Sequence, residues 1–275
     1  MTDIYQWLFG ARGRAGVTLP MEPLPDELLP FRAQIEATVK PIIAGRVLDG
    51  PPAKPTGSQL GGRPWWPAAL EYPRSQDGQP LFLLAQINLA ETELFEPFPE
   101  HGLLQLFIAA GELYGANLDD LTVPNGFHAV LHTNLSQPPA VLRFAAERLA
   151  GPKLYLPLQE PLRARAIALT RDAMPIDIRD YRFGSVLPDI AADDDLLEHY
   201  ADWHMAAPIR LGGYASFTQD DPRDDETDLG DFNLLTIDTT DGIMWGDSGI
   251  GQFLMHEADL RRRDFKRVAY NWDCC

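Results

Sequence analysis

The sequence predicts an α+β fold with a largely antiparallel β core, built from two pseudo-repeated lobes with peripheral helices. Three observations support this prediction. The 275 residues include 24 prolines and 22 glycines, which suit many short strands joined by turns better than a helical bundle. Apolar strand pairs occur twice, at 81–109 and 233–255. Leu-Gly-Gly also occurs twice, at 60–62 and 211–213, each time the same distance before a leucine of an apolar strand (Leu84 and Leu235).

The N-terminal part of the chain predicts a loosely held arm followed by a helix. Apolar residues recur at roughly helical spacing over 25–44, Asp26 can cap this helix, and Pro41 bends or ends it. We therefore expect an N-terminal arm and helix at 1–45. The rest, 46–275, is expected to be one structural unit whose two lobes occupy about 46–160 and 161–275.

The remaining elements follow from apolar periodicity and turn residues. The segment 50–67 is too rich in proline and glycine for regular structure, and 140–150 fits a strand or a short helix. The chain predicts strands at 81–89, 103–109, 127–134, 162–170 and 266–273, a strand–turn–strand at 233–255, and helices at 193–206 and 257–265.

The chain is strongly acidic. Forty Asp and Glu oppose 23 Lys and Arg, for a formal net charge of −17. Such a surface repels nucleic acid and anionic membranes, so we expect neither as a partner. It attracts basic proteins or cations; the alternative is that the acidity only keeps the protein soluble.

The cysteines and the N-terminus bear on the cellular compartment. The only two cysteines, Cys274 and Cys275, are adjacent, whereas a disulfide-stapled fold needs spaced pairs. The N-terminus does not have the residue order of a signal peptide, and we expect a cytoplasmic protein. In a reducing cytoplasm the pair is expected at a buried strand end; a vicinal disulfide and a thiolate metal site are the alternatives.

Seven segments resemble the YwqG-like family, a domain of unknown function (number 1963). They are LGGRPWWP (60–67), PLFLLAQINLAE (80–91), HGLLQLFI (101–108), GGYASFTQDD (212–221), NLLTIDTT (233–240), MWGDSGIGQFLM (244–255) and ADLRRRDF (258–265). The resemblance covers the chain from about residue 50 to its end. It implies a mixed, largely antiparallel fold with two related lobes, and it brings no catalytic residues.

Gly246-Asp247-Ser248-Gly249 matches the residues around the nucleophile of chymotrypsin-like proteases. That chemistry needs a histidine base and an acid that orients it. No histidine of this sequence has the neighbouring residues of such a base, and the Gly-Pro that follows the protease motif is missing. We interpret the motif as a turn and predict no catalytic residues.

Two acidic segments could bind cations or partners. The spacings within 195–202 place three carboxylates and an imidazole on neighbouring helical turns, where they could hold a metal; we favour a solvated face and expect no metal or cofactor. The acidic loop 220–231 lacks EF-hand spacing. A solvated loop and a docking surface for a basic protein are both open. The weak metal candidates are Asp195, Glu198, His199 and Asp202, and the partner-binding candidates are Asp221, Asp224, Asp225, Glu226 and Asp228.

Polar and aromatic residues inside the family-like segments could line a cleft between the lobes, where small-molecule sites often occur. Alternatively, they tie the lobes together or pack a loop over the core. The cleft candidates are Gln86, Asn88, Trp65, Trp66, Gln219, Asp220, Trp245 and Asp247.

The sequence thus leads to two functional hypotheses. The preferred one is a non-enzymatic acidic module that binds a basic protein, for example an immunity protein that neutralises a toxin. The alternative is a small-molecule-binding protein or enzyme with a cleft between the two lobes.

Overall fold

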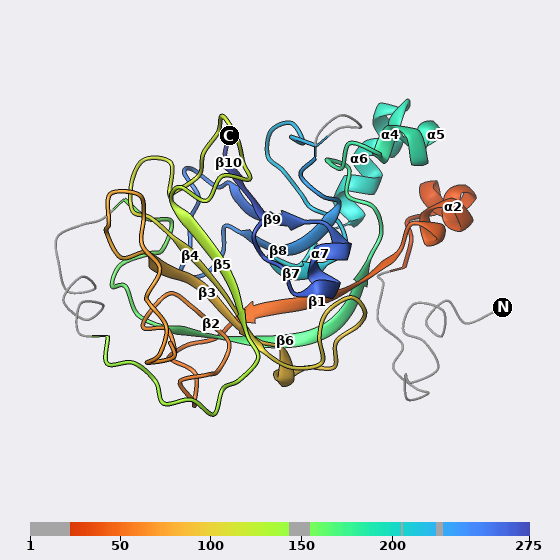
Figure 1. The fold of residues 1–275 in the computed structure, drawn as a ribbon. Helices are drawn as coiled ribbons and strands as arrows, with labels where there is room; N and C mark the ends of the chain where they lie inside the picture. Colours follow the sequence, from red (N-terminus) through yellow and green to blue (C-terminus); the bar gives the residue numbers. More distant parts are fainter. Residues whose placement is uncertain (1–22, 143–154, 205, 224–227) are drawn as a thin grey trace.

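Ten antiparallel strands form a single sheet that curls into a nearly closed barrel (Figure 1). A computed structural model describes residues 23–142, 155–204, 206–223 and 228–275. The strand order is β10-β9-β8-β7-β1-β6-β2-β3-β4-β5. The strands are β1 (Lys40–Val47), β2 (Gln59–Leu60), β3 (Phe82–Asn88), β4 (Leu103–Ile108), β5 (Phe127–His132), β6 (Arg165–Met174), β7 (Ile209–Gly212), β8 (Phe232–Asp238), β9 (Ile250–Met255) and β10 (Ala269–Asp273).

The helices are short and lie outside the sheet. One group gathers beside the N-terminal end of β1, and α7 follows β9 directly (Figure 1). The helical elements are η1 (Asp26–Phe31), α2 (Arg32–Ala37), η2 (Leu89–Glu91), α4 (Phe183–Val186), α5 (Pro188–Ala191), α6 (Asp194–Trp203) and α7 (Glu257–Arg262). The fold is therefore α+β with a β-dominated core, as the prolines, glycines and alternating apolar residues predict.

The two ends of the sheet approach each other across the barrel. The backbone N–H of Tyr270 in β10 donates to the carbonyl of Leu121, just before β5, at 2.9 Å. The rings of Phe127 and Tyr270 lie 5.4 Å apart. Every residue of β4 and of β9 is buried, because one face of each strand points into the barrel and the other is covered by loops.

Two clusters of apolar side chains hold the elements together. The larger one joins strands from the whole sheet, including Leu84, Leu106, Ile209, Leu235 and Phe253. The smaller one packs the helices of the N-terminal segment and of 183–203 against the end of β6, through side chains such as Leu28, Ile35, Phe183 and Tyr200. Both clusters are dominated by groups whose removal from water stabilises the fold.

Glycines shape both loops that leave the Leu-Gly-Gly motifs. Gly62 and Gly213 have positive φ angles of 73° and 66°, which residues with a Cβ rarely adopt. A Cβ on Gly62 would lie 2.6 Å from Ala164, and one on Gly213 would lie 2.4 Å from the Ile42 side chain. The chain therefore needs glycine at these two positions for space as well as for backbone conformation.

The predicted helix over 25–44 is wrong in its second half. η1 and α2 end at Ala37, and β1 begins at Lys40. Val39, Ile42 and Ile43 are β-branched, and the pairing of β1 with both β6 and β7 outweighs their helical spacing. Asp26 does not cap a helix; Pro25 holds the cap position. The division of the chain at residue 45 stays a prediction, and it falls inside β1.

The strands predicted at 81–89, 103–109, 127–134, 162–170, 233–255 and 266–273 are confirmed, as are the helices in 193–206 and 257–265. The short strands β2 and β7 were not predicted, because two to four residues are too few to show periodicity. The predicted arm at 1–20 lies outside the described residues, as does nearly all of 140–150.

Candidate functional site

A neutral polar network lies between the first half of the sheet and the loop that covers its outer face, around Gln86 of β3. Its Oε1 accepts hydrogen bonds from the backbone N–H of Trp65 at 3.1 Å and from Nε2 of Gln105 at 2.7 Å. Its Nε2 donates to the carbonyls of Pro55 and Gly57, at 2.9 and 2.7 Å. Gln86 is fully buried and uses its whole hydrogen-bonding capacity, so it fastens the irregular segment before β3 to the sheet.

His132 completes this network. Its Nε2 lies 3.0 Å from Oε1 of Gln105, and its ring packs edge-on against Trp65 and Trp66 at centroid distances of 5.5 and 4.9 Å. Burial, with a smaller contribution from His128, lowers the pKa of His132 to about 4. The histidine is therefore neutral at physiological pH.

The second half of the barrel contains a charged network instead. Arg210 of β7 is 1% exposed, and it donates to the carbonyls of Tyr214 at 3.2 Å and Ala207 at 3.1 Å. It also donates to Oγ of Ser216, which in turn donates to the carboxylate of Asp177. Burial lowers the pKa of Arg210, and the charge of Asp177 opposes that shift.

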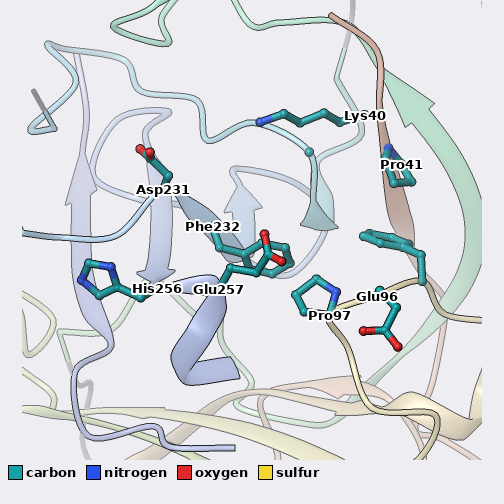
Figure 2. Close-up of a pocket in the computed structure, with 10 residues that line it drawn as sticks. Lys40, Pro41, Glu96, Pro97, Asp231, Phe232, His256 and Glu257 are labelled. Carbon is teal, nitrogen blue, oxygen red and sulfur yellow. The ribbon is translucent and has the colours of Figure 1, made fainter. Parts of the chain in front are cut away.

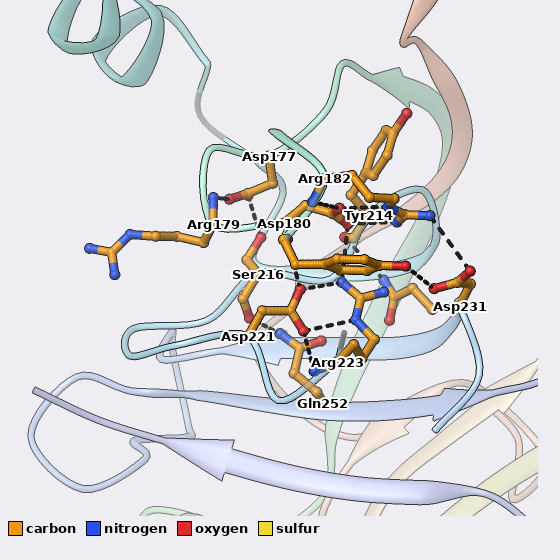
Figure 3. A network of polar contacts seen from close by, with 12 residues as sticks. Asp177, Arg179, Asp180, Arg182, Tyr214, Ser216, Asp221, Arg223, Asp231 and Gln252 are labelled. Atoms are coloured by element: carbon orange, nitrogen blue, oxygen red, sulfur yellow. Dashed lines mark hydrogen bonds and ion pairs between the residues drawn. The ribbon is translucent and has the colours of Figure 1, made fainter. Parts of the chain in front are cut away.

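An ion cluster extends from this network toward the surface (Figure 3). Oδ2 of Asp180 lies 2.7 Å from Arg182 and 3.0 Å from Arg223, and Arg223 lies 2.7 Å from Asp221. Burial pushes the pKa of Asp180 upward, but the hydrogen bond from Arg182 and the charge of Arg223 outweigh it, so this pKa lies below its ordinary value. The side chains of Asp180, Asp221 and Arg223 are almost fully buried, so the cluster is structural.

A pocket of about 370 Å³ lies at one end of the barrel, where β1 and β8 begin and β7 and β9 end (Figure 2). Its floor is apolar and consists of Pro41, Phe95, Pro97 and Phe232. The ring of Phe98, behind the floor, contacts both Phe95 and Phe232. Gly213 forms part of the wall. Barrel mouths are common places for small-molecule sites, and this volume suits a small ligand.

Charged residues of both signs and a histidine surround the apolar floor. They are Lys40, Glu96, Asp231, His256 and Glu257. Glu96 and Glu257 both bind Arg261, at 2.6 and 2.7 Å. Asp231 accepts from the Tyr181 hydroxyl at 3.2 Å, and His256 lies 2.9 Å from Asp228.

Lys40 differs from the other polar groups of the pocket. Its ammonium lies over the ring of Tyr214, 4.1 Å from the centroid, but no described residue gives it an ion pair or a hydrogen bond. Burial, followed by the charge of Arg182, lowers its pKa. Lys40 is thus a partly desolvated cation on the pocket wall; the charges of Asp180 and Asp231 oppose the shift of its pKa, but no described carboxylate forms an ion pair with it.

None of the eight cleft candidates lines this pocket. Trp65, Trp66, Gln86 and Trp245 are at most 5% exposed, and Gln86 is engaged in the network that holds Trp65. The other four, Asn88, Gln219, Asp220 and Asp247, are at least partly accessible to solvent. Their role as ligand-binding residues stays a prediction.

The partner-binding candidates have different environments. Asp221 is buried in the ion cluster, so its carboxylate is already neutralised by Arg223. Asp228 is 77% exposed and pairs with His256 and Arg267. Asp224, Asp225 and Glu226 lie outside the described residues.

A stronger acidic surface lies on the helices α5 and α6 and the turn between them. Residues 187–209 contain no lysine or arginine, and within the described chain none of their carboxylates forms an ion pair. Asp193 uses its carboxylate to cap α6 at the N–H of Leu196. The acids of this surface are Asp189, Asp193, Asp194, Asp195, Glu198 and Asp202.

The weak metal candidates Asp195, Glu198, His199 and Asp202 all lie in α6. Over the residues with described positions, no group of three or more His, Cys, Asp or Glu side chains is arranged to hold a metal ion. Ser248 is exposed and has a φ of 107° in the turn that its N–H closes with the carbonyl of Trp245.

The expected burial of both cysteines is wrong. Cys274 is half-buried, Cys275 is exposed, and both are free thiols, because β10 ends at Asp273 and the last two residues extend beyond the sheet.

The pocket residues come from five separate segments, so no local pattern in the sequence points to them. Lys40 and Pro41 fell inside a predicted helix, and Phe95 to Pro97 inside a connecting loop. An indirect signal was available: a glycine pair after β7 marks a place where the backbone needs unusual conformations, and such places are often near binding sites.

The fold and the site define an acidic α+β protein with a nearly closed antiparallel barrel and a small pocket at one end. The family model described as "Domain of unknown function (DUF1963)" matches residues 58–274, so the chain belongs to that family. The YwqG-like resemblance of the seven segments is thereby confirmed. No curated protein matches the chain. Among the described residues, no helix is long and apolar enough to cross a membrane.

Proposed function

We propose that this protein is a non-enzymatic binding module that docks a basic protein on the acidic surface of α5 and α6. The observation that carries the proposal is the local imbalance of charge: six carboxylates within 187–209 and no cation among them. Elsewhere many acids are neutralised by arginines, as in the ion cluster and around Arg261. Uncompensated charge on a convex helical surface attracts an oppositely charged partner over about a Debye length, roughly 8–10 Å at physiological salt.

A toxin-neutralising immunity protein in the cytoplasm is one concrete form of this proposal. Many toxins that act on nucleic acid are basic, because they must bind a polyanion. An acidic inhibitor surface competes for the same basic groups and speeds the encounter. The chain's overall charge of −17 supports such a role.

The test compares two variants of equal net charge. The first neutralises the helical surface: Asp194→Asn, Asp195→Asn, Glu198→Gln and Asp202→Asn, leaving the capping Asp193 intact. The control neutralises four exposed acids on loops elsewhere: Glu71→Gln, Glu112→Gln, Asp119→Asn and Glu160→Gln. Each variant carries four fewer negative charges than the wild type.

The measurement is a pull-down from the source organism at increasing salt, with the affinity of any partner then measured on the purified pair. We expect the wild type and the control to retain the partner at low salt and the helical variant to lose it. Equal retention by both variants would refute the helical surface. Loss from both would reduce the interaction to general charge attraction.

The second candidate function is the binding of a small molecule at the barrel mouth. The specific observation in its favour is that the pocket joins the two predicted lobes. Phe95, Glu96 and Pro97 belong to the first, and Gly213, Asp231 and His256 to the second. A thermal-shift screen with metabolites tests it, because a ligand that binds only the folded state raises the melting temperature by mass action.

We also propose that the barrel consists of two pseudo-repeated halves. The support is that β2 to β5 run outward from β6 in chain order, and β7 to β10 run outward from β1 in the same way. Each half has a register shift between its second and third strands. In the first half it lies at Leu83/Ala85 between β3 and β4, and in the second at Asn233/Leu235 between β8 and β9. The two positive-φ glycine pairs follow β2 and end β7.

A further inference from the structure

We propose that the pocket at the barrel mouth binds a zwitterionic α-amino acid with an apolar side chain. This inference rests on the second candidate function and names the ligand class for it; it is independent of the docking surface on α6. It follows from the pocket's size, its floor and the signs of the charges around it.

The size of the pocket limits the ligand to a small molecule. Its volume of about 370 Å³ lies at the low end of the range of about 300–1,000 Å³ that is typical of ligand pockets. A long peptide exceeds it. A single amino acid leaves room for a few bridging waters, which are common in such sites.

The floor selects an apolar body. Phe95, Phe232, Pro41 and Pro97 present rings rather than hydrogen-bonding groups. Phe98 supports Phe95 and Phe232 from behind with edge-to-face ring contacts at 5.6 and 5.3 Å. An aliphatic or aromatic side chain placed on this floor loses contact with water, and this removal stabilises the complex.

The charges around the floor select both ends of an amino acid. Lys40 is the pocket cation without a described carboxylate partner, so a ligand carboxylate supplies what it lacks. Asp231 is 64% exposed; it forms a long ion pair with Arg182 at 3.8 Å and accepts from the Tyr181 hydroxyl, and it remains accessible to a ligand. Glu257 also lines the pocket, and it binds Arg261 through Oε1 alone. When Lys40 holds the carboxylate of the ligand, the ligand's ammonium lies close by. Asp231 and Glu257 are the protein carboxylates that bind it there.

Ligands of a single charge fit this arrangement less well. A cation alone leaves Lys40 unpaired in a partly desolvated site, and an anion alone faces Glu96, Asp231 and Glu257. Only a molecule with a negative and a positive charge close together pairs with both Lys40 and the carboxylates. The charge pattern therefore favours the zwitterion over either half of it.

The experiment is a cycle of three ligands and five proteins, measured by titration calorimetry on the full chain. The ligands are phenylalanine, phenethylamine, which lacks the carboxylate, and 3-phenylpropanoate, which lacks the ammonium. The variants are Lys40→Met, Asp231→Asn and Glu257→Gln, and they are compared with the wild type. Lys54→Met, an exposed lysine outside the pocket, is the matched control.

We expect the wild type and Lys54→Met to bind phenylalanine about tenfold or more tightly than either truncated ligand, since a hydrogen bond to a charged group contributes about 1.5–3 kcal/mol. In Lys40→Met, phenylalanine should bind no better than phenethylamine. In Asp231→Asn or Glu257→Gln, its advantage over 3-phenylpropanoate should fall.

Three outcomes would overturn the proposal: no binding of phenylalanine at millimolar concentration, unchanged affinity in Lys40→Met, or tighter binding of phenethylamine than of phenylalanine in the wild type. A metabolite of other chemistry that binds the wild type and is lost in Lys40→Met would leave the small-molecule function standing and overturn only the amino-acid assignment. Melting curves of each variant identify any loss of folding.

Discussion

The two halves of the barrel fasten their loops to the sheet with different chemistry. In the first half the buried polar groups are amides and a neutral histidine, centred on Gln86 and Gln105. In the second half they are charged, with Arg210 and Asp177 inside and Asp180 with Arg223 nearer the surface. The same architectural task, holding the loop after a glycine pair, is thus performed once without net charges and once with them.

The free-energy cost of burying a polar side chain is offset differently for an amide and for an ion. An amide loses a few hydrogen bonds to water and regains them inside, as Gln86 does with four partners. A buried ion loses several kcal/mol of hydration, which only a complete set of oppositely charged partners restores. Removing one partner should therefore be more damaging in the charged half than in the neutral half.

The largest effect is expected for Asp180→Ala. It leaves Arg223, which is 3% exposed, with Asp221 alone and removes the main partner of Arg182. We expect a loss of about 3–5 kcal/mol in the free energy of unfolding, measured by urea denaturation. Glu36→Gln, which breaks the exposed Arg32–Glu36 pair at 3.2 Å, is the control and should cost about 0.5 kcal/mol or less. Similar losses for both would contradict the comparison.

A smaller effect is expected at a matched pair of positions in the two halves, Gln86 and Thr236. Each faces the strand that carries its partner, Gln105 or Gln252. Gln86→Leu leaves several buried groups unpaired and should cost about 1–3 kcal/mol. Thr236→Val removes one donor, 2.7 Å from Gln252, and should cost about 1 kcal/mol. Both losses are measured as shifts of the denaturant midpoint at an unchanged slope of the unfolding free energy. A larger loss for Thr236→Val than for Gln86→Leu would contradict the expected difference between the two positions.

The smallest effect concerns pH, and it appears in both halves. Burial lowers the pKa of His132 and of His204 to about 4, against 6.5 for an ordinary histidine. Between these values the unfolded chain binds more protons than the folded one, so stability falls as the pH drops from 6.5 toward 4. We expect His132→Gln and His204→Gln each to flatten this dependence, measured as unfolding free energy at several pH values. An unchanged slope would show that folding does not lower the pKa of these histidines.

Much of the sheet could be predicted from the sequence because its long strands alternate or run continuously apolar. The runs in β3, β4 and β9 are apolar apart from the amides Gln86, Asn88, Gln105 and Gln252, and they contain no charged residue to suggest another structure. β1 was missed because local spacing in 25–44 fits a helix, and only the distant strands β6 and β7 make the extended form more stable. Tertiary pairing of this kind leaves no mark in a local pattern.

The site could be predicted less well than the fold. Gln86 and Trp245 stood out because they are polar or large residues in apolar segments, and the structure buries both. Lys40 did not stand out, since an isolated charge beside a strand is the ordinary pattern of a surface, and Asp231 stood out only as one acid of the loop 220–231. The role of these residues depends on which distant segments fold next to them, and local sequence patterns do not show those tertiary contacts.

The position of β1 has a consequence for dissecting the molecule. The family match begins at residue 58, yet β1 spans Lys40–Val47 and sits mid-sheet between β6 and β7. A polypeptide trimmed to the family match would lack β1. The backbone donors and acceptors of β6 and β7 that pair with β1 would then be unpaired. Unpaired strand edges of this kind pair readily with strands of neighbouring molecules, so trimming is expected to cause strand exchange or aggregation. A synthetic peptide of residues 38–48 would supply the missing strand and pair with both free edges.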